Sequence, residues 1–242
     1  MNPDPERARS FGAAVDAYEV GRPDYSAESV AWLLEGAPGR VLDLGAGSGK
    51  LTRAVLDLGR DVVAVDPDAA MLARNPAPDT HLGTAEAIPL PDSSVAAVVV
   101  GQAWHWFDPN SAGAEIARVL VSGGRLGLVW NTRDRSHPFV AAVAEAIGAS
   151  PAEDMVDADE VLALAGFTPW QRRQWQRVRW MSAGEVIAMA TSRSAYLIAC
   201  PAEQRAVVDQ LTELLVTHPH SRGRERFEYT LNVTGYRCDR LR

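Results

Sequence analysis

The sequence has 242 residues but only two cysteines, Cys200 and Cys238, which are too few for a disulfide framework. Its five histidines lack the spacing of a zinc site, so we expect no metal centre. It contains no run of about 18 apolar residues, which a membrane-spanning helix requires. The first residues also lack the charged and apolar regions of a secretion signal. These absences predict a cytoplasmic protein that makes no membrane contact.

Positive charge is scarce in the first part of the chain. Residues 1–150 carry 12 basic and 19 acidic side chains, residues 151–242 carry 12 of each, and the net charge is −7. An acidic chain does not attract nucleic acid over long distances. Arginine alternates with tryptophan in residues 171–180, which leaves a local nucleic-acid contact as an alternative, but a solvated strand face explains the same pattern. We therefore expect no nucleic-acid partner.

The most informative stretch is a glycine-rich turn between a predicted strand and a predicted helix. Val41–Leu44 is a short apolar run, residues 45–49 have the pattern G-x-G-x-G, and apolar residues at helical spacing follow up to Leu58. Glycine permits positive φ angles and lets a ligand approach the backbone, while a helix N-terminus offers free N–H groups. The turn therefore predicts a binding corner for a nucleotide-like ligand.

Spacing separates the ligand classes that use such a corner. A phosphate-binding P-loop requires glycine where Leu44 stands and serine or threonine where Leu51 stands. A dinucleotide fingerprint requires its third glycine at the position of Lys50. Asp43 lies two residues before the first glycine, and its carboxylate would repel a pyrophosphate. A ligand with an ammonium or sulfonium charge fits this turn better.

This turn, residues 43–49, resembles the first motif of the class I S-adenosylmethionine (SAM)-dependent methyltransferases. The next predicted strand, Val62–Val65, ends at Asp66, and the resemblance implies that this carboxylate binds the ribose hydroxyls of SAM. A helix N-cap is the structural alternative for Asp66. The resemblance implies a SAM site formed by Asp43, Gly45, Ala46, Gly47, Asp66, Pro67, Met71, Ala85, Glu86 and Gln102.

A further apolar strand, Val95–Val100, is followed by the sequence Gly-Gln-Ala-Trp-His-Trp-Phe-Asp-Pro. Ligands of open α/β sheets bind beyond the carboxyl ends of the strands, so the amide, the imidazole and both indoles are expected to face the site. His105 is the candidate catalytic base for a hydroxyl acceptor, with helix capping as its alternative. This segment resembles the small-molecule methyltransferase branch that includes trans-aconitate methyltransferase. The same branch has a loop like that formed by Tyr18, Arg22, Pro23 and Tyr25.

The end of another predicted strand, Arg125–Asn131, supplies more candidate acceptor contacts. Asn131 can hydrogen-bond an acceptor, and Arg133 can hold a carboxylate, with surface solvation as its alternative. In the family a helical insertion caps the substrate, which makes Tyr196 a candidate. The expected acceptor site comprises Tyr18, Arg22, Tyr25, Trp104, Trp106, Asn131, Arg133 and Tyr196.

Periodicity predicts the elements of the remaining chain. Helices are expected over Phe139–Ile147, Ala158–Leu164, Ser182–Thr191 and Ala202–Val216, and strands over Phe167–Trp180 and Phe227–Tyr236.

The resemblance implies one α/β domain with a Rossmann-like seven-stranded sheet, mostly parallel, with an antiparallel last strand and a helical cap. Residues 1–35 are expected to form an N-terminal lid, residues 36–135 the SAM-binding core, and residues 182–222 the cap. The expected activity is methyl transfer from SAM to an oxygen of a small molecule, either a carboxylate or a hydroxyl, which yields S-adenosylhomocysteine (SAH). A SAM-binding protein without catalysis, a nucleic-acid methyltransferase and a nicotinamide dehydrogenase remain alternatives.

Overall fold

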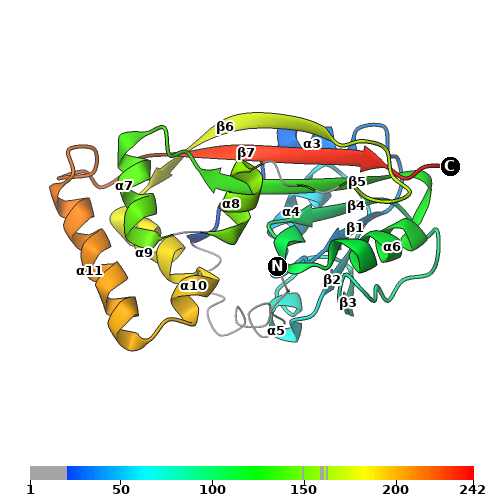
Figure 1. The fold of residues 1–242 in the computed structure, drawn as a ribbon, viewed down its shortest axis with the longest axis horizontal. Coiled ribbons are helices and arrows are strands. Elements are labelled where there is room, and N and C mark those ends of the chain that lie inside the picture. The colour runs from blue at the N-terminus through cyan, green and yellow to red at the C-terminus, as the bar shows by residue number, and fades with distance from the viewer. Residues whose placement is uncertain (1–20, 149, 159–160, 162) are drawn as a thin grey trace.

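The computed structural model describes residues 21–148, 150–158, 161 and 163–242. In this part of the chain a seven-stranded sheet runs through the molecule in the order β3-β2-β1-β4-β5-β7-β6 (Figure 1). The strands are β1 (Val41–Leu44), β2 (Val62–Asp66), β3 (Asp79–Leu82), β4 (Val95–Gly101), β5 (Leu120–Arg133), β6 (Gln171–Met181) and β7 (Phe227–Asp239).

Strand direction matches the predicted Rossmann-like sheet. Strands β1 to β5 pair in parallel, whereas β7 pairs antiparallel with both of its neighbours, β5 and β6. Six strands therefore share one direction and the last strand of the chain opposes them. The mostly parallel sheet with an antiparallel last strand is confirmed.

Helices cover both faces of the sheet. One face carries α3 (Ala27–Leu34), α4 (Lys50–Asp57) and α5 (Ala69–Leu72). The other carries α6 (Pro109–Val119), α8 (Pro151–Asp157) and the short 3₁₀ helix η2 (Trp104–Trp106). None of the described helices has the length and apolar character needed to span a bilayer.

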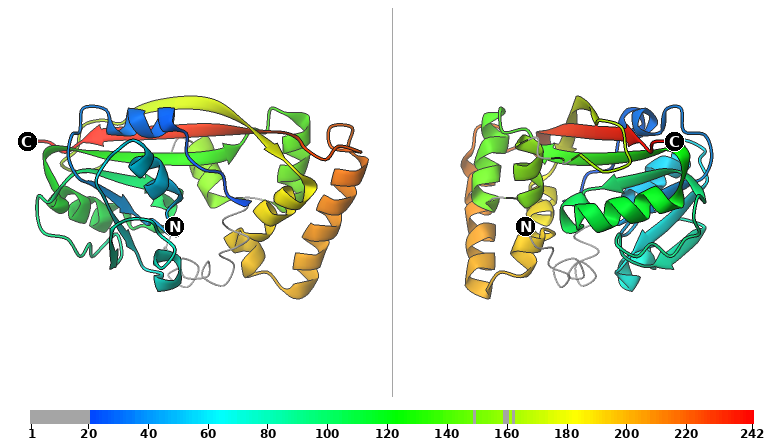
Figure 2. Two further views of the ribbon diagram at one scale, coloured as in Figure 1. Left: turned by 180° about the vertical axis from the view of Figure 1, so that it is seen from behind. Right: turned by 45° about the vertical axis from the view of Figure 1, so that its right-hand side comes forward.

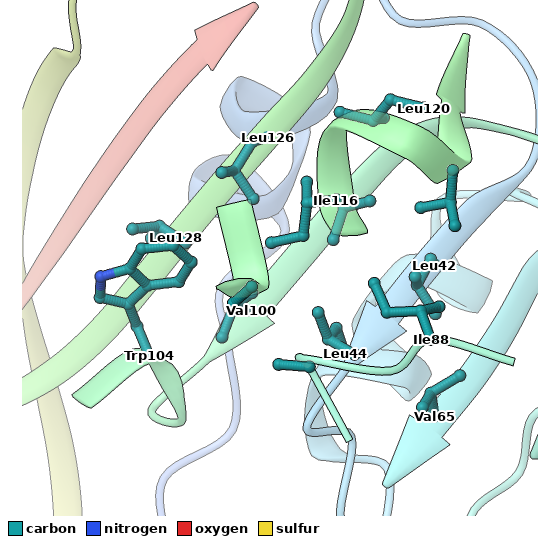
Figure 3. Close-up of a cluster of buried hydrophobic side chains, with 14 of the residues drawn as sticks. Leu42, Leu44, Val65, Ile88, Val100, Trp104, Ile116, Leu120, Leu126 and Leu128 are labelled. Carbon is teal, nitrogen blue, oxygen red and sulfur yellow. The ribbon is translucent and has the colours of Figure 1, made fainter. Parts of the chain in front are cut away.

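The central strands β1, β2 and β4 are buried on both faces, as their mostly apolar sequences predict. On the α6 side, Leu42 and Leu44 of β1 and Leu128 of β5 pack around Ile116 of α6 (Figure 3). On the opposite side, Leu33 of α3 lies so close to the sheet that a Cβ at the Gly127 position would be 3.1 Å from its side chain. The sheet is therefore held by two cores at once.

A second group of helices gathers at one end of the molecule (Figures 1 and 2). It consists of α7 (Pro138–Ile147), α9 (Ala183–Thr191), α10 (Ser194–Leu197) and α11 (Pro201–Thr217), called here the helical lobe. The long strands β5, β6 and β7 extend toward this lobe, and α9 to α11 connect β6 to β7. A separate core joins the lobe to the strands: Phe139 of α7 contacts the rings of Phe227 and Tyr229 on β7.

One predicted helix is misplaced. The helix expected over Ala158–Leu164 is instead α8, which begins at Pro151 and ends at Asp157, with Ala158 as its C-cap. Proline suits the first turn of a helix, and Glu153 in that turn complements the positive helix N-terminus, so the start signals lie earlier than the apolar periodicity indicates. Of the other five predicted elements after residue 138, the four that begin with Phe139, Ser182, Ala202 and Phe227 are confirmed within two residues at their starts. The strand expected over Phe167–Trp180 is β6, which begins four residues later, at Gln171.

We predict that Phe139→Ala destabilises the protein by about 3 to 5 kcal/mol, because it removes a fully buried ring from the core between lobe and strands. Urea denaturation followed by circular dichroism measures the free energy of unfolding. Val216→Ala, at an exposed position of α11, is the control and should change that energy by less than about 0.5 kcal/mol. Equal effects of the two variants would contradict the assignment of this core.

Candidate functional site

The turn between β1 and α4 is closed by backbone geometry that glycine permits. Gly45, Gly47 and Gly49 have φ angles of 70°, 52° and 89°. The amide of Gly47 donates to Oδ2 of Asp66 at 2.8 Å, which ties the turn to the end of β2. A Cβ at Gly45 would lie 2.7 Å from Cβ of Ala103, so a larger residue would force the two loops apart. Ala46 lies between the two glycines and is buried.

Asp66 organises the backbone around it with both carboxylate oxygens. Oδ1 accepts from the amide of Asp68 at 2.8 Å, while Oδ2 accepts from Gly47, and burial raises the pKa of Asp66. Asp68, not Asp66, caps α5, so the capping alternative for Asp66 is wrong. Pro67 lies between the two carboxylates, and a Cβ at Gly47 would be 3.2 Å from Cε of Met71. The predicted SAM residues of β1, β2 and α5 are therefore together.

Asp43 is fully buried in β1. Its Oδ2 accepts from the hydroxyl of Thr52 at 2.6 Å, but its Oδ1 has no hydrogen-bond partner among the described residues. Burial, with a smaller contribution from the negative charge of Asp66, raises the pKa of Asp43 to about 7. A cationic group near this carboxylate would compensate the buried charge.

The loops after β3 and β4 lie at the same edge of the sheet, because these strands run parallel to β1 and β2. After β3, Ala85 is buried and Glu86 is exposed, and the Glu86 carboxylate accepts from the amide of Asp108 at 3.0 Å. After β4, Gln102 has a positive φ of 59°, and its side-chain amide donates to the carbonyl of Asn131 at 2.8 Å. These bonds connect the loops that border the glycine turn.

The aromatic segment after β4 divides between core and site. The side chain of Trp104 is only 3% exposed and packs beside Val100 and Leu128 in the core (Figure 3). The expectation that both indoles face the acceptor is therefore wrong for Trp104, because the 3₁₀ turn directs this residue onto the sheet. Trp106 is partly buried and lies 4.8 Å from the ring of His105, centroid to centroid.

His105 is held neutral by its surroundings. Burial lowers its pKa to about 3, and the positive charges of Arg22 and Arg193 act in the same direction. Its Nδ1 has no hydrogen-bond partner in the described part of the chain. His105 can therefore exchange a hydrogen bond with a ligand, but it is a weak base.

The segment of residues 21–25 links the sheet to the helical lobe. Asp24 forms an ion pair with Lys50 of α4 at 2.9 Å, and Arg22 donates to the carbonyl of Ser192 at 3.5 Å. Tyr25 lies against the end of β4, since a Cβ on Gly101 would be 2.6 Å from its hydroxyl. The predicted acceptor residue Tyr18 lies outside the described residues.

Arg133 is engaged inside the protein. Its Nη2 pairs with Oε2 of Glu153 on α8 at 2.5 Å, and the same nitrogen donates to the carbonyl of Gly148 at 3.0 Å. The side chain of Arg133 is almost completely buried. The expectation that Arg133 holds a substrate carboxylate is wrong in this geometry, because Glu153 already provides the carboxylate. Asn131, two residues earlier, is also buried. Neither the oxygen nor the nitrogen of its side-chain amide has a hydrogen-bond partner among the described residues.

Arg193 is a residue of this site that the sequence pattern missed. It follows α9, lies near Arg22 and acts on the charge of His105. Tyr196, the predicted cap residue, lines the same hollow as Arg193. No local signal marks Arg193, because the groups near it come from distant segments of the chain.

The described residues contain no group of three or more histidine, cysteine, aspartate or glutamate side chains suited to hold a metal ion. The arginines of β6 make contacts within the chain: Arg173 pairs with Glu28 of α3 at 3.1 Å, and Arg179 donates to the carbonyl of Gly21 at 3.0 Å. The site thus combines a glycine turn, two buried carboxylates, a neutral imidazole and the arginines Arg22 and Arg193.

Comparison with known proteins agrees with this geometry. A family model described as a methyltransferase domain matches residues 42–128. An uncharacterized methyltransferase of Mycobacterium tuberculosis is 50% identical over 217 residues, which cover 87% of each chain. Another, from Schizosaccharomyces pombe, is 31% identical over 245 residues, which cover 96% of this chain and 98% of that one.

A solved structure described as a type II methyltransferase from Anaeromyxobacter dehalogenans is similar in fold. Its TM-score is 0.68 at 22% identity, and the match covers 90% of this chain and 97% of that chain. This likeness supports the sheet order and the placement of the helices.

We predict that Asp43 makes stability depend on pH. Its pKa of about 7 in the folded protein exceeds the value of about 4 for an unfolded aspartate, so its stabilising contribution is complete below about pH 4 and is lost as the pH rises through about 7. Asp43→Asn keeps an acceptor for Thr52 and removes the titration. Between pH 5 and pH 8 the wild type should lose on the order of 2 kcal/mol relative to Asp43→Asn.

Urea denaturation of both proteins without ligand, across this pH range, measures the difference. Parallel stability curves for wild type and variant would show that the carboxyl of Asp43 is not perturbed.

Proposed function

Since this chain belongs to the methyltransferase domain family, we propose that it transfers a methyl group from SAM to a small molecule. The observation that carries the proposal is the glycine turn tied to Asp66, with the unpartnered Oδ1 of the buried Asp43 beside it. A buried carboxylate of raised pKa suits a ligand that brings positive charge, and SAM carries both an ammonium and a sulfonium group.

The residues fit SAM in kind as well as in charge. Glycine at positions 45 and 47 lets a ligand contact the main chain, and the carboxylate of Asp66 can accept additional hydrogen bonds from ribose hydroxyls. The residues proposed to hold SAM are Asp43, Gly45, Ala46, Gly47, Asp66, Pro67, Met71, Ala85, Glu86 and Gln102.

SAM supplies a methyl group on a positively charged sulfur, so transfer is a displacement that leaves a neutral thioether. The residues of the chain then have to align the acceptor and exclude water. His105, neutral with a pKa of about 3, provides a hydrogen bond and is a poor base. An acceptor that is already ionised needs no base, so we favour a carboxylate oxygen over a hydroxyl.

The acceptor is proposed to be a small molecule like those of the branch that includes trans-aconitate methyltransferase. Tyr25 lies against Gly101 at the end of β4. The other acceptor contacts are proposed to come from Arg22, Trp106, Asn131 and Tyr196. Two arginines of β6, by contrast, are engaged within the chain, Arg173 with Glu28 of α3 and Arg179 with the carbonyl of Gly21, which argues against a nucleic-acid surface.

We predict that isothermal titration with SAH gives saturable binding and that titration with NADH gives none. The glycine spacing and Asp43 disfavour a pyrophosphate, whereas the unpartnered carboxylate oxygen favours an ammonium group. Binding of NADH alone would overturn the proposal in favour of a dehydrogenase. Binding of SAH without methylation of any small acid or phenol would favour a non-catalytic SAM-binding protein.

A second prediction concerns Asp66. Asp66→Ala should weaken SAH binding at least about tenfold, because it removes an acceptor for the ribose and releases the amide of Gly47. Asp57→Ala, at the exposed end of α4, is the matched control and should bind SAH like the wild type. If the Asp66→Ala protein is folded and its affinity for SAH is unchanged, the assignment of this carboxylate to the ribose is wrong.

A further inference from the structure

Among the described residues, several arginines share the single carboxylate of Glu153 where the sheet meets the helical lobe. Arg133 binds both oxygens of Glu153, Oε2 from Nη2 at 2.5 Å and Oε1 from Nε at 2.9 Å, and Arg135 contacts Oε2 at 3.3 Å. Arg193 reaches Oε1 only at 3.9 Å. Arg22 donates to the carbonyl of Ser192, the residue before Arg193. One carboxylate therefore serves a cluster of guanidinium groups, and Arg133 uses most of its capacity.

Arg193 carries its charge in an unfavourable place. Its side chain is only 13% exposed. Burial lowers its pKa to about 9, and the charges of Arg133 and Arg22 oppose it more than Glu153 supports it. A buried guanidinium whose charge is only partly compensated is stabilised by a bound anion. The guanidinium has already lost its water in the free protein, so binding does not have to desolvate it again.

A neutral donor lies in the same cluster. Tyr229 of β7 is fully buried, and its hydroxyl has no hydrogen-bond partner among the described residues. Its titration is influenced by Arg133, Glu153 and Arg193, which places it near all three. A phenol and a guanidinium together can satisfy the oxygens of one anionic group.

Arg193 also forms part of the wall of a hollow in the helical lobe. Tyr196 lines the same hollow, and its other walls are aliphatic side chains of α7, α9 and α11 and of the segment between α10 and α11: Ile147, Ala190, Ala199 and Val207. One charged group in an otherwise apolar wall suits a ligand with one charged end and a hydrocarbon body.

We propose that Arg193 recognises the carboxylate of a small organic acid whose hydrocarbon body occupies this hollow. Binding of the acid follows from the charge cluster and the hollow alone. That the acid is the methyl acceptor rests on the proposed function. Arg193 lies near enough to act on the charge of His105, which follows β4 at the sheet edge of the proposed SAM site.

Methylation of such an acid would remove the charge that Arg193 recognises. A carboxylate oxygen forms the new O–C bond, the C–S bond breaks, and its electron pair stays on sulfur, so no proton is transferred. The product is a neutral ester. Arg193 therefore binds the substrate more tightly than the product, which favours release of the ester.

The test is titration of the SAH-saturated protein with hexanoate, hexanamide and acetate. Hexanoate should bind, and hexanamide and acetate should bind at least about tenfold more weakly, because one lacks the charge and the other the hydrocarbon body. Arg193→Gln should weaken hexanoate binding at least about tenfold, Arg193→Lys should restore part of it, and Arg205→Gln, exposed on α11, should match the wild type.

Unchanged SAH affinity and thermal unfolding of Arg193→Gln show that the variant is folded. The proposal is overturned if the wild type does not bind hexanoate, if Arg193→Gln binds it equally well, or if hexanamide or acetate binds as tightly. If SAH itself does not bind, the proposed function fails, and the same titrations of the protein alone still decide the role of Arg193.

Discussion

The hydrogen bond from the amide of Gly47 to the carboxylate of Asp66, 2.8 Å long, fixes the turn after β1 to the end of β2. This hydrogen bond forms because Gly47 adopts a positive φ angle. The bond partly offsets the cost of burying the Asp66 carboxylate. Parallel pairing of β1, β2 and β4 then brings the loops after all three strands to this same edge. The ligand corner is therefore a consequence of strand direction and of one turn, and its shape depends little on long, mobile side chains.

A second constraint comes from buried charge. The ion pair of Arg133 with Glu153 joins the end of β5 to α8, and a buried pair of this kind adds little net stability because both groups lose water. Its larger effect is positional. By holding Glu153 on Arg133, it leaves Arg193 at the margin of the pair, facing other cations. The positive charge of Arg193 is therefore incompletely compensated, because Glu153 pairs mainly with Arg133.

Local patterns were sufficient for individual strands, which follow from apolar runs, and for the glycine turn, which follows from its spacing. The number of strands and the antiparallel last strand were implied by the resemblance to the methyltransferases. Local patterns were insufficient for Trp104, Arg133 and Arg193, whose surroundings come from other segments. Trp104 is aromatic at a strand end, which fits a ligand wall as well as a core, and only the packing of β5 decides between them. The partner of Arg133 is 20 residues further along the chain, on a helix that periodicity placed after residue 158. Whether the predicted SAM residues bind SAM stays a prediction.

The charge state of His105 links the two halves of the site. An imidazole whose pKa is about 3 cannot usefully remove a proton from a hydroxyl, because the transfer would be uphill by several pKa units. The arginines that contribute to this weak basicity are the groups that attract an anion. An anion near Arg22 and Arg193 offsets their charge, but the burial that is the main cause of the low pKa of His105 persists. The same side chains that disfavour base catalysis on a neutral acceptor therefore support the proposal of an acceptor that arrives ionised.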